Sequence, residues 1–140
     1  MSVIVLRGTK GSPLSHQEVD DNFTHLNNDK AGYVAGEGGT QTQGTSKSTG
    51  VTLSKKCGTI TMHNAALAAD GIVSFTLTNT TIAATDVVSL NHSSGGTAGK
   101  YALNAAAGAG SAVITVTNIS AGSLSEAIVI RFAVIKAVTA

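Results

Sequence analysis

The sequence predicts a mainly β protein: an antiparallel β-sandwich, jelly-roll-like, of seven to eight strands, preceded by an extended N-terminal arm and one short α-helix. Three observations predict this class. From residue 51 onward, apolar and polar residues alternate with a period of two, which is typical of strands with one buried face. Glycine-rich turn signals separate the alternating runs. Helix-start signals coincide at one place, just before residue 20.

Seven segments have the pattern of strands. In the segment Ile72–Thr78, Val73, Phe75 and Leu77 alternate with serine and threonine, so one face is expected to be buried and the other solvated. The last segment, Ala127–Ala137, is largely apolar on both faces, which predicts a central strand or one at a subunit contact. The other candidates are Val51–Cys57, Thr59–Met62, Val87–His92, Tyr101–Ala106 and Ala112–Ile119. Short strands joined by such turns indicate a sandwich.

The helix is predicted from its first turn. Ser15 and Glu18 have the spacing of a capping box, in which each side chain bonds the other residue's backbone amide. Leu14 and Val19 are spaced for a hydrophobic staple, and Pro13 holds the entering chain extended. The sequence therefore predicts a helix over residues 16–27.

The same helix carries one narrow apolar stripe. Val19, Phe23 and Leu26 follow one another at spacings of four and three residues, which places them on one face. A helix this short is marginal alone and needs a surface to pack on. Two surfaces are possible: the chain's own β-domain, or another copy or another protein, in which case the helix is an anchor.

The remaining N-terminal half divides into an arm and a linker. Residues 2–6 form a β-branched, strand-like arm with no partner close in sequence, and the arm is expected to add to a neighbouring sheet edge. Its apolar residues are Val3, Ile4, Val5 and Leu6. Six glycines among threonine, serine and glutamine predict a flexible linker over residues 31–50. The expected organisation is an anchor (1–30), a linker (31–50) and a β-sandwich domain (51–140).

Composition excludes several classes of function. Charged residues make up only 12% of the chain and the net charge is +1, so the clustered lysine and arginine of a nucleic-acid interface are missing. Every apolar run falls far short of the roughly 20 residues of a membrane span. The N-terminus lacks the pattern of a signal peptide, so synthesis in a cytoplasm is expected.

The residues with reactive side chains form no recognisable site. The four histidines lack metal-ligand spacing, and the three acids after residue 45 are isolated from one another, whereas a glycosidase needs two carboxylates across a cleft. The single cysteine, Cys57, is expected to be a small buried side chain on a strand. We therefore expect no enzyme activity, no cofactor, no metal and no small-molecule substrate. The residues concerned are His16, His25, His63, His92, Asp70, Asp86 and Glu126.

Three stretches carry a resemblance to a known family. The run LRGTKGSPLSHQEVDDNFTHLN resembles the short N-terminal segment of many tailed-bacteriophage virion proteins, including tail-fibre proteins. The stretches TSKSTGVTLSKKCGTITMHNAAL and SLSEAIVIRFAVIKA resemble a small β-domain of such proteins. The resemblance covers most of the chain and implies a virion structural protein, made in the host bacterial cytoplasm, whose β-module forms a homotrimer.

Three functions remain open at this point. The first is a capsid decoration or cement protein, whose partner is the major capsid protein or another virion protein and whose location is the capsid surface. The second is a short tail or head fibre, with the helix as anchor and the β-domain as receptor-binding tip. The third, a free carbohydrate-binding module, leaves the capped helix unexplained. Small size favours the first, and the scarcity of aromatic residues and arginine after residue 50 counts against the second.

Overall fold

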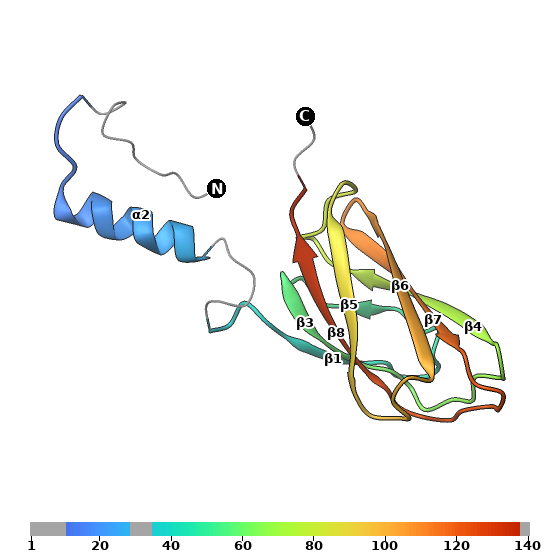
Figure 1. The fold of residues 1–140 in the computed structure, drawn as a ribbon. Helices are drawn as coiled ribbons and strands as arrows, with labels where there is room; N and C mark the ends of the chain where they lie inside the picture. Colours follow the sequence, from blue (N-terminus) through green and yellow to red (C-terminus); the bar gives the residue numbers. More distant parts are fainter. Residues whose placement is uncertain (1–10, 29–34, 138–140) are drawn as a thin grey trace.

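The computed structural model describes residues 11–28 and 35–137. Within these residues the chain forms one helix, α2 (His16–Asn28), followed by eight strands (Figure 1). The strands are β1 (Thr40–Thr42), β2 (Val51–Thr52), β3 (Cys57–Thr61), β4 (Ile72–Thr78), β5 (Val87–Ser94), β6 (Tyr101–Gly108), β7 (Ser111–Asn118) and β8 (Val129–Ile135).

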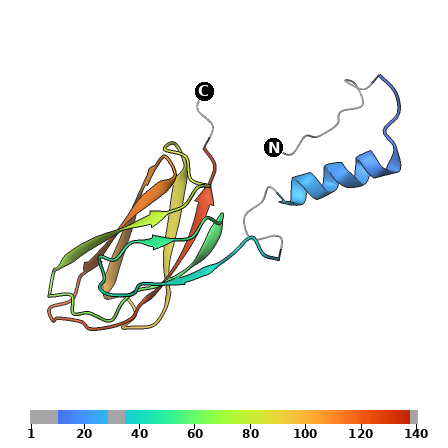
Figure 2. The ribbon, with the colours of Figure 1, turned by 180° about the vertical axis from the view of Figure 1, so that it is seen from behind.

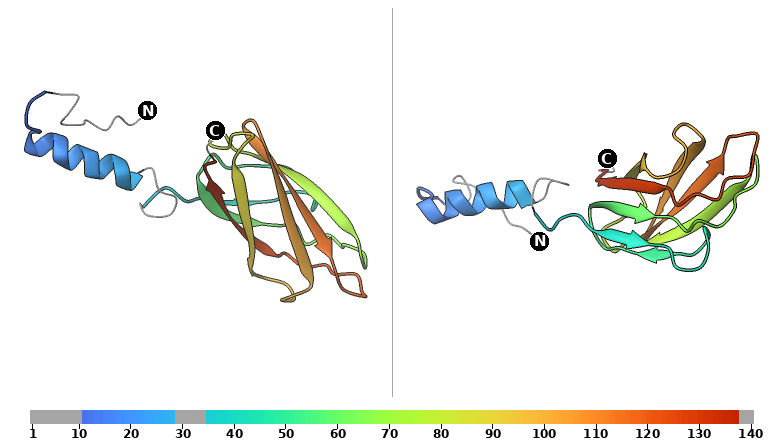
Figure 3. Two further views of the ribbon diagram at one scale, coloured as in Figure 1. Left: turned by 45° about the horizontal axis from the view of Figure 1, so that its top comes forward. Right: turned by 90° about the horizontal axis from the view of Figure 1, so that it is seen from below.

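The strands form two four-stranded sheets that face each other across one core (Figures 2 and 3). Sheet A has the strand order β1-β3-β8-β5, and sheet B has the order β2-β4-β7-β6. The predicted mainly β sandwich with one short helix before it is confirmed.

The sheets are mixed, so the prediction that all strands are antiparallel is wrong. Thr40 of β1 pairs with Thr59 of β3 in a parallel register, and Val51 of β2 pairs with Leu77 of β4 in the same way. Strands β1 to β4 alternate between the two sheets, and this passage through the opposite sheet supplies the crossover that a parallel pair requires. A period-two pattern shows which face is buried but not the direction of the neighbouring strand. The jelly-roll order is not confirmed by this topology.

The core follows the predicted alternation. In β4, Phe75 and Leu77 are buried. In β8, Ile130, Phe132 and Val134 are buried, and the strand lies between β3 and β5, which confirms that it is central. Most of the core is aliphatic, and β-branched side chains pack well on a pleated surface.

The predicted linker ends earlier than expected. Residues 40–50 belong to the sandwich: β1 is paired with β3, and both Gln43 and Lys47 are buried. The Lys47 Nζ donates to the carbonyl oxygens of His63 (2.6 Å) and Glu126 (2.5 Å). The Gln43 side chain accepts from the His63 amide at 3.0 Å. The boundary at residue 50 was wrong because long polar side chains, rather than an apolar pattern, hold this segment.

The predicted strand Val51–Cys57 is also divided. Only its first two residues form β2, and its last residue, Cys57, begins β3 in the opposite sheet. Cys57 is half-buried rather than buried, and its Sγ lies 3.8 Å from the carbonyl oxygen of Glu37. The predicted strand Val87–His92 runs two residues further, as β5, and the ring of His92 meets the Tyr101 ring edge-on at 5.7 Å between centroids.

Two fully buried asparagines close turns at the strand ends. Asn118, the last residue of β7, donates from Nδ2 to the carbonyl oxygens of Leu67, Ala68 and Gly122. Asn79, just after β4, donates from Nδ2 to the Lys55 carbonyl oxygen at 2.8 Å. Within the described residues, every buried side-chain nitrogen and oxygen has a hydrogen-bond partner. These two turns are thus held by the hydrogen bonds of buried side-chain amides.

Two carboxylates hold other parts of the sandwich. Asp86 accepts from the Ala83 amide at 2.8 Å and pairs with Lys136 at 2.6 Å, and these contacts, the amide first, hold the pKa of Asp86 below its ordinary value. Glu126 accepts from the Thr97 hydroxyl and amide and from the Tyr101 hydroxyl. Those hydrogen bonds, led by the Thr97 hydroxyl, hold the pKa of Glu126 below its ordinary value.

We expect Lys47→Met to lower the free energy of unfolding by about 1–3 kcal/mol, because two backbone carbonyls lose their donor while the apolar stem is kept. Chemical denaturation measures the change. Lys100→Met, at an exposed turn position, is the matched control and is expected to change the free energy by less than about 0.5 kcal/mol. Equal stability of the two variants would show that the Lys47 ammonium does not hold the segment.

We expect stability to fall in acid. Because the folded-state pKa values of Asp86 and Glu126 are lowered, their contribution is present above the unfolded pKa values and is lost as pH falls through the folded ones. The urea midpoint should therefore decline below about pH 4. Asp86→Asn should reduce this decline. Asp70→Asn, at an exposed turn residue with φ of 55° that asparagine also tolerates, should leave the decline unchanged.

Candidate functional site

Helix α2 begins with a complete capping box. The Ser15 amide donates to Glu18 Oε2 at 2.7 Å, and the Glu18 amide donates to Ser15 Oγ at 3.2 Å. The Val19 amide donates to the Ser15 carbonyl oxygen at 3.1 Å and so closes the first helical turn. The predicted helix start is therefore confirmed. The box satisfies two backbone donors of the first turn without help from the sandwich.

The apolar stripe of α2 is open to solvent. Val19 is 36% exposed, Phe23 68% and Leu26 48%. With Leu14 and Asn22, these side chains line a shallow hollow of about 250 Å³ on the helix itself. Figures 1 and 3 show α2 apart from both sheets. Packing of the stripe on the chain's own β-domain is absent from this arrangement of the described residues.

The opposite face of α2 is polar. Gln17 Nε2 donates to Asp21 Oδ1 at 2.8 Å, which is a side-chain pair at a spacing of four residues. The Thr24 hydroxyl donates to the Asp20 carbonyl oxygen at 2.9 Å. Because these groups bond one another or the backbone, the polar face is stable in water. The stripe is the face of α2 that gains from contact with another surface.

The second part of the predicted anchor lies outside the described residues. Val3, Ile4, Val5 and Leu6 belong to that part of the chain, so the strand-like arm stays a prediction. The other four predicted interface residues lie together on one side of α2 and just before it. They are Leu14, Val19, Phe23 and Leu26.

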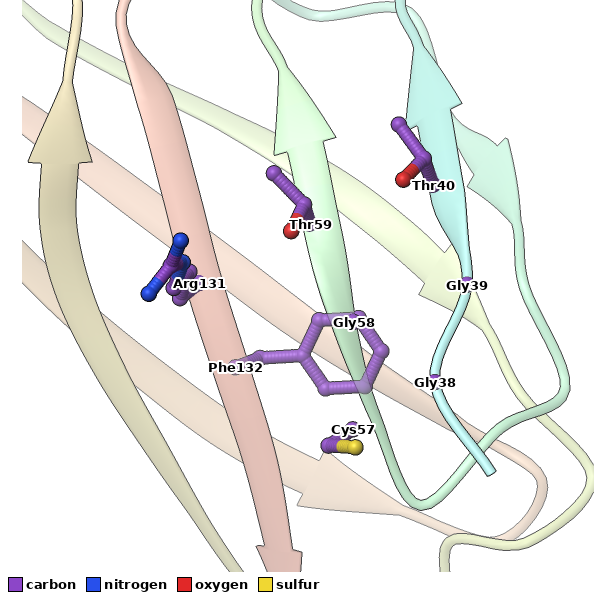
Figure 4. A pocket seen from close by; sticks show the side chains of 8 residues that line it. All are labelled: Gly38, Gly39, Thr40, Cys57, Gly58, Thr59, Arg131 and Phe132. Carbon is purple, nitrogen blue, oxygen red and sulfur yellow. The ribbon is translucent and has the colours of Figure 1, made fainter. Parts of the chain in front are cut away.

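The sequence analysis did not predict a second concave site. A hollow of about 480 Å³ opens on sheet A where β1, β3 and β8 lie side by side (Figure 4). Its lining contains one charged side chain, Arg131, whereas three of its residues are glycines. The lining residues are Gly38, Gly39, Thr40, Cys57, Gly58, Thr59, Arg131 and Phe132. They come from three separated segments, and no motif in the sequence links them.

The apolar stripe of α2 is suited to pack against another protein surface. Anchor residues at i, i+4 and i+7 are typical of a helix that lies in an apolar groove of a partner. Residues 11–28 and 35–137 contain no group of three or more histidine, cysteine, aspartate or glutamate side chains placed to hold a metal ion. Among these same residues, no helix has the length and apolar character needed to cross a membrane.

Comparisons of the chain with protein-family models, with curated proteins and with solved structures find no match.

Proposed function

We propose that this chain is a structural protein of a tailed-bacteriophage virion and that it acts as a trimeric decoration, or cement, protein of the capsid. Helix α2 anchors it on the major capsid protein or another virion protein. The β-sandwich lies on the shell, joins neighbouring capsid subunits and stabilises the head. The observation that carries this proposal is the capped helix, whose apolar stripe is exposed.

The cap prepares α2 for docking. A helix of 13 residues is marginal in water, and most of its stability in a complex comes from the packed face. Because the capping box starts the helix before Val19, all three apolar residues lie within it, and their spacing places Val19, Phe23 and Leu26 on one face. Phe23 is the largest and most exposed of these residues, so we assign it as the main anchor in a partner groove.

The outer face of sheet B is suited to lie against protein. Its central strands present serine, threonine, alanine and single apolar residues, and no charged residue occurs in β4, β6 or β7. Ile72 is 68% exposed and Val113 45% exposed on this face. Ser74 and Thr115 satisfy each other across the strands at 2.8 Å. A face without charges loses little solvation free energy when it is covered, which favours a shell-bound role.

A short tail or head fibre is the second candidate. In that role α2 is again the virion anchor, and the β-domain is a receptor-binding tip. The observation that favours it is the hollow on sheet A, because a concave site with one exposed arginine is suited to bind a ligand.

We expect Val19→Ala combined with Phe23→Ala to abolish incorporation of the chain into phage particles, because the variant removes most of the apolar anchor. The chain in purified particles is measured by quantitative mass spectrometry. Asp20→Ala combined with Thr24→Ala has the same four-residue spacing on the polar face and is the control, for which normal incorporation is expected. Normal incorporation of the Val19 and Phe23 variant, with its β-domain folded, would refute the anchor.

We expect the full chain to sediment as a trimer at micromolar concentration. The core is built mainly from aliphatic side chains, and apolar area buried between copies would add to the area that it buries. Analytical ultracentrifugation measures the mass. A monomer over this range would remove the trimer from the proposal but would leave the anchor untouched.

The copy number of the chain per particle separates the two candidates. A cement protein is expected at hundreds of copies, near one for each capsid subunit, because it repeats with the shell lattice. A fibre is expected at a few to a few tens. Quantitative mass spectrometry against the major capsid protein gives the ratio, and absence from purified particles would refute both roles.

A further inference from the structure

The hollow on sheet A lies beside a polar row that crosses all four strands. Thr40 of β1 pairs with Thr59 of β3, Thr59 pairs with Arg131 of β8, and Arg131 pairs with Asn91 of β5. In each sheet, side chains of directly paired residues point to the same face. The row therefore places two hydroxyls, a guanidinium and an amide next to one another on the outer face. Figure 4 shows the two threonines and Arg131 of this row.

Arg131 is the one charged residue of this row. It is exposed, and within residues 11–28 and 35–137 its guanidinium makes no hydrogen bond and no ion pair. It borders two hollows, the one of about 480 Å³ toward β1 and another of about 260 Å³ toward β5. Asp86 forms an ion pair with Lys136, and Glu126 accepts hydrogen bonds from Thr97 and Tyr101. Neither carboxylate pairs with Arg131.

Two glycines of the lining determine the shape of the larger hollow. A Cβ on Gly58 would lie 2.8 Å from the Gly39 carbonyl oxygen, so this glycine is needed for the close approach of β1 and β3. A Cβ on Gly38 would lie no closer than 3.7 Å to Cys57 Sγ. The wall at Gly38 is therefore open, and a side chain there would fill the hollow without a clash of its Cβ.

We propose that the larger hollow binds a sugar that carries a carboxylate, with Arg131 on the carboxylate and the Thr40 and Thr59 hydroxyls on the sugar hydroxyls. The planar guanidinium fork matches a carboxylate in a bidentate pair. A doubly charged phosphate is less suited, because the lining holds a single cation. A volume of about 480 Å³ falls in the range of small-molecule sites. This inference does not rest on the virion role.

Cys57 is a built-in reporter for this site. It is the only cysteine of the chain, it is half-buried, and it lines the hollow. The experiment measures the rate at which iodoacetamide alkylates Cys57 in the full chain. Mass spectrometry gives the modified fraction over time. The probes are D-glucuronate, D-glucose and inorganic phosphate at equal ionic strength. We expect glucuronate to slow the reaction with a saturating concentration dependence, and glucose and phosphate to have little effect.

Two variants test the roles of the lining residues. Arg131→Gln removes the cation and is expected to weaken the protection by glucuronate at least about tenfold, the size of effect that follows loss of a charge-assisted hydrogen bond. Gly38→Leu fills the hollow with Arg131 in place and is expected to abolish the protection. Lys100→Gln removes an exposed positive charge from a turn outside the row and is the control, expected to keep full protection. Thermal unfolding followed by circular dichroism establishes that each variant is folded.

Three outcomes would overturn the inference. These are absence of protection by glucuronate, equal protection in Arg131→Gln, and protection by phosphate as strong as that by glucuronate. The last would show a site for a simple anion and not for an acidic sugar. The incorporation and copy-number experiments remain decisive for the virion role in every case, because they depend on α2 and on the particle.

Discussion

The buried ammonium of Lys47 is the contact on which the arrangement of the sandwich depends most. It joins the segment after β1 to the carbonyl oxygens of His63 and Glu126, the latter 79 positions away. Burial lowers the pKa of Lys47, and the charge of Glu126 opposes this effect. From Glu126, further hydrogen bonds reach Thr97 and the buried Tyr101, whose pKa is raised by burial. One connected set of polar contacts thus ties together the segment between β1 and β2, the segment after β3, the start of β6 and the segment before β8.

This set explains how a chain with few charges and few aromatic side chains holds its loops. Surface ion pairs contribute little to stability, whereas an unpaired buried polar group is costly. The chain places its polar side chains where they satisfy backbone groups: Gln43, Asn79 and Asn118 all do so from buried positions. The outer face of sheet B is then free to carry neutral residues, and a neutral face associates at the least cost in solvation.

The two proposed surfaces differ in how they are built. The stripe on α2 is assembled within one helix, and its capping bonds span three residues. The hollow on sheet A needs the register of three strands, and the parallel pairing of β1 with β3 provides one of its walls. A protein with an anchor on its helix and a ligand site on its sandwich separates attachment from recognition. The stripe can be disrupted by substitution without disturbing the core, because its residues lie outside the core cluster.

By itself, the sequence determined the features that depend on near neighbours. The helix start at Ser15, the stripe through Phe23 and the buried faces of β4 and β8 follow from spacings within a few residues, because helix caps and side-chain periodicity are local. Only the tertiary structure decided that β1 pairs with β3 and β2 with β4 in parallel, that Lys47 is buried, and that Arg131 has no partner among the described residues and lies beside a hollow. These features join residues far apart in the chain, and strand order and register are set by packing of the whole sandwich rather than by any single segment.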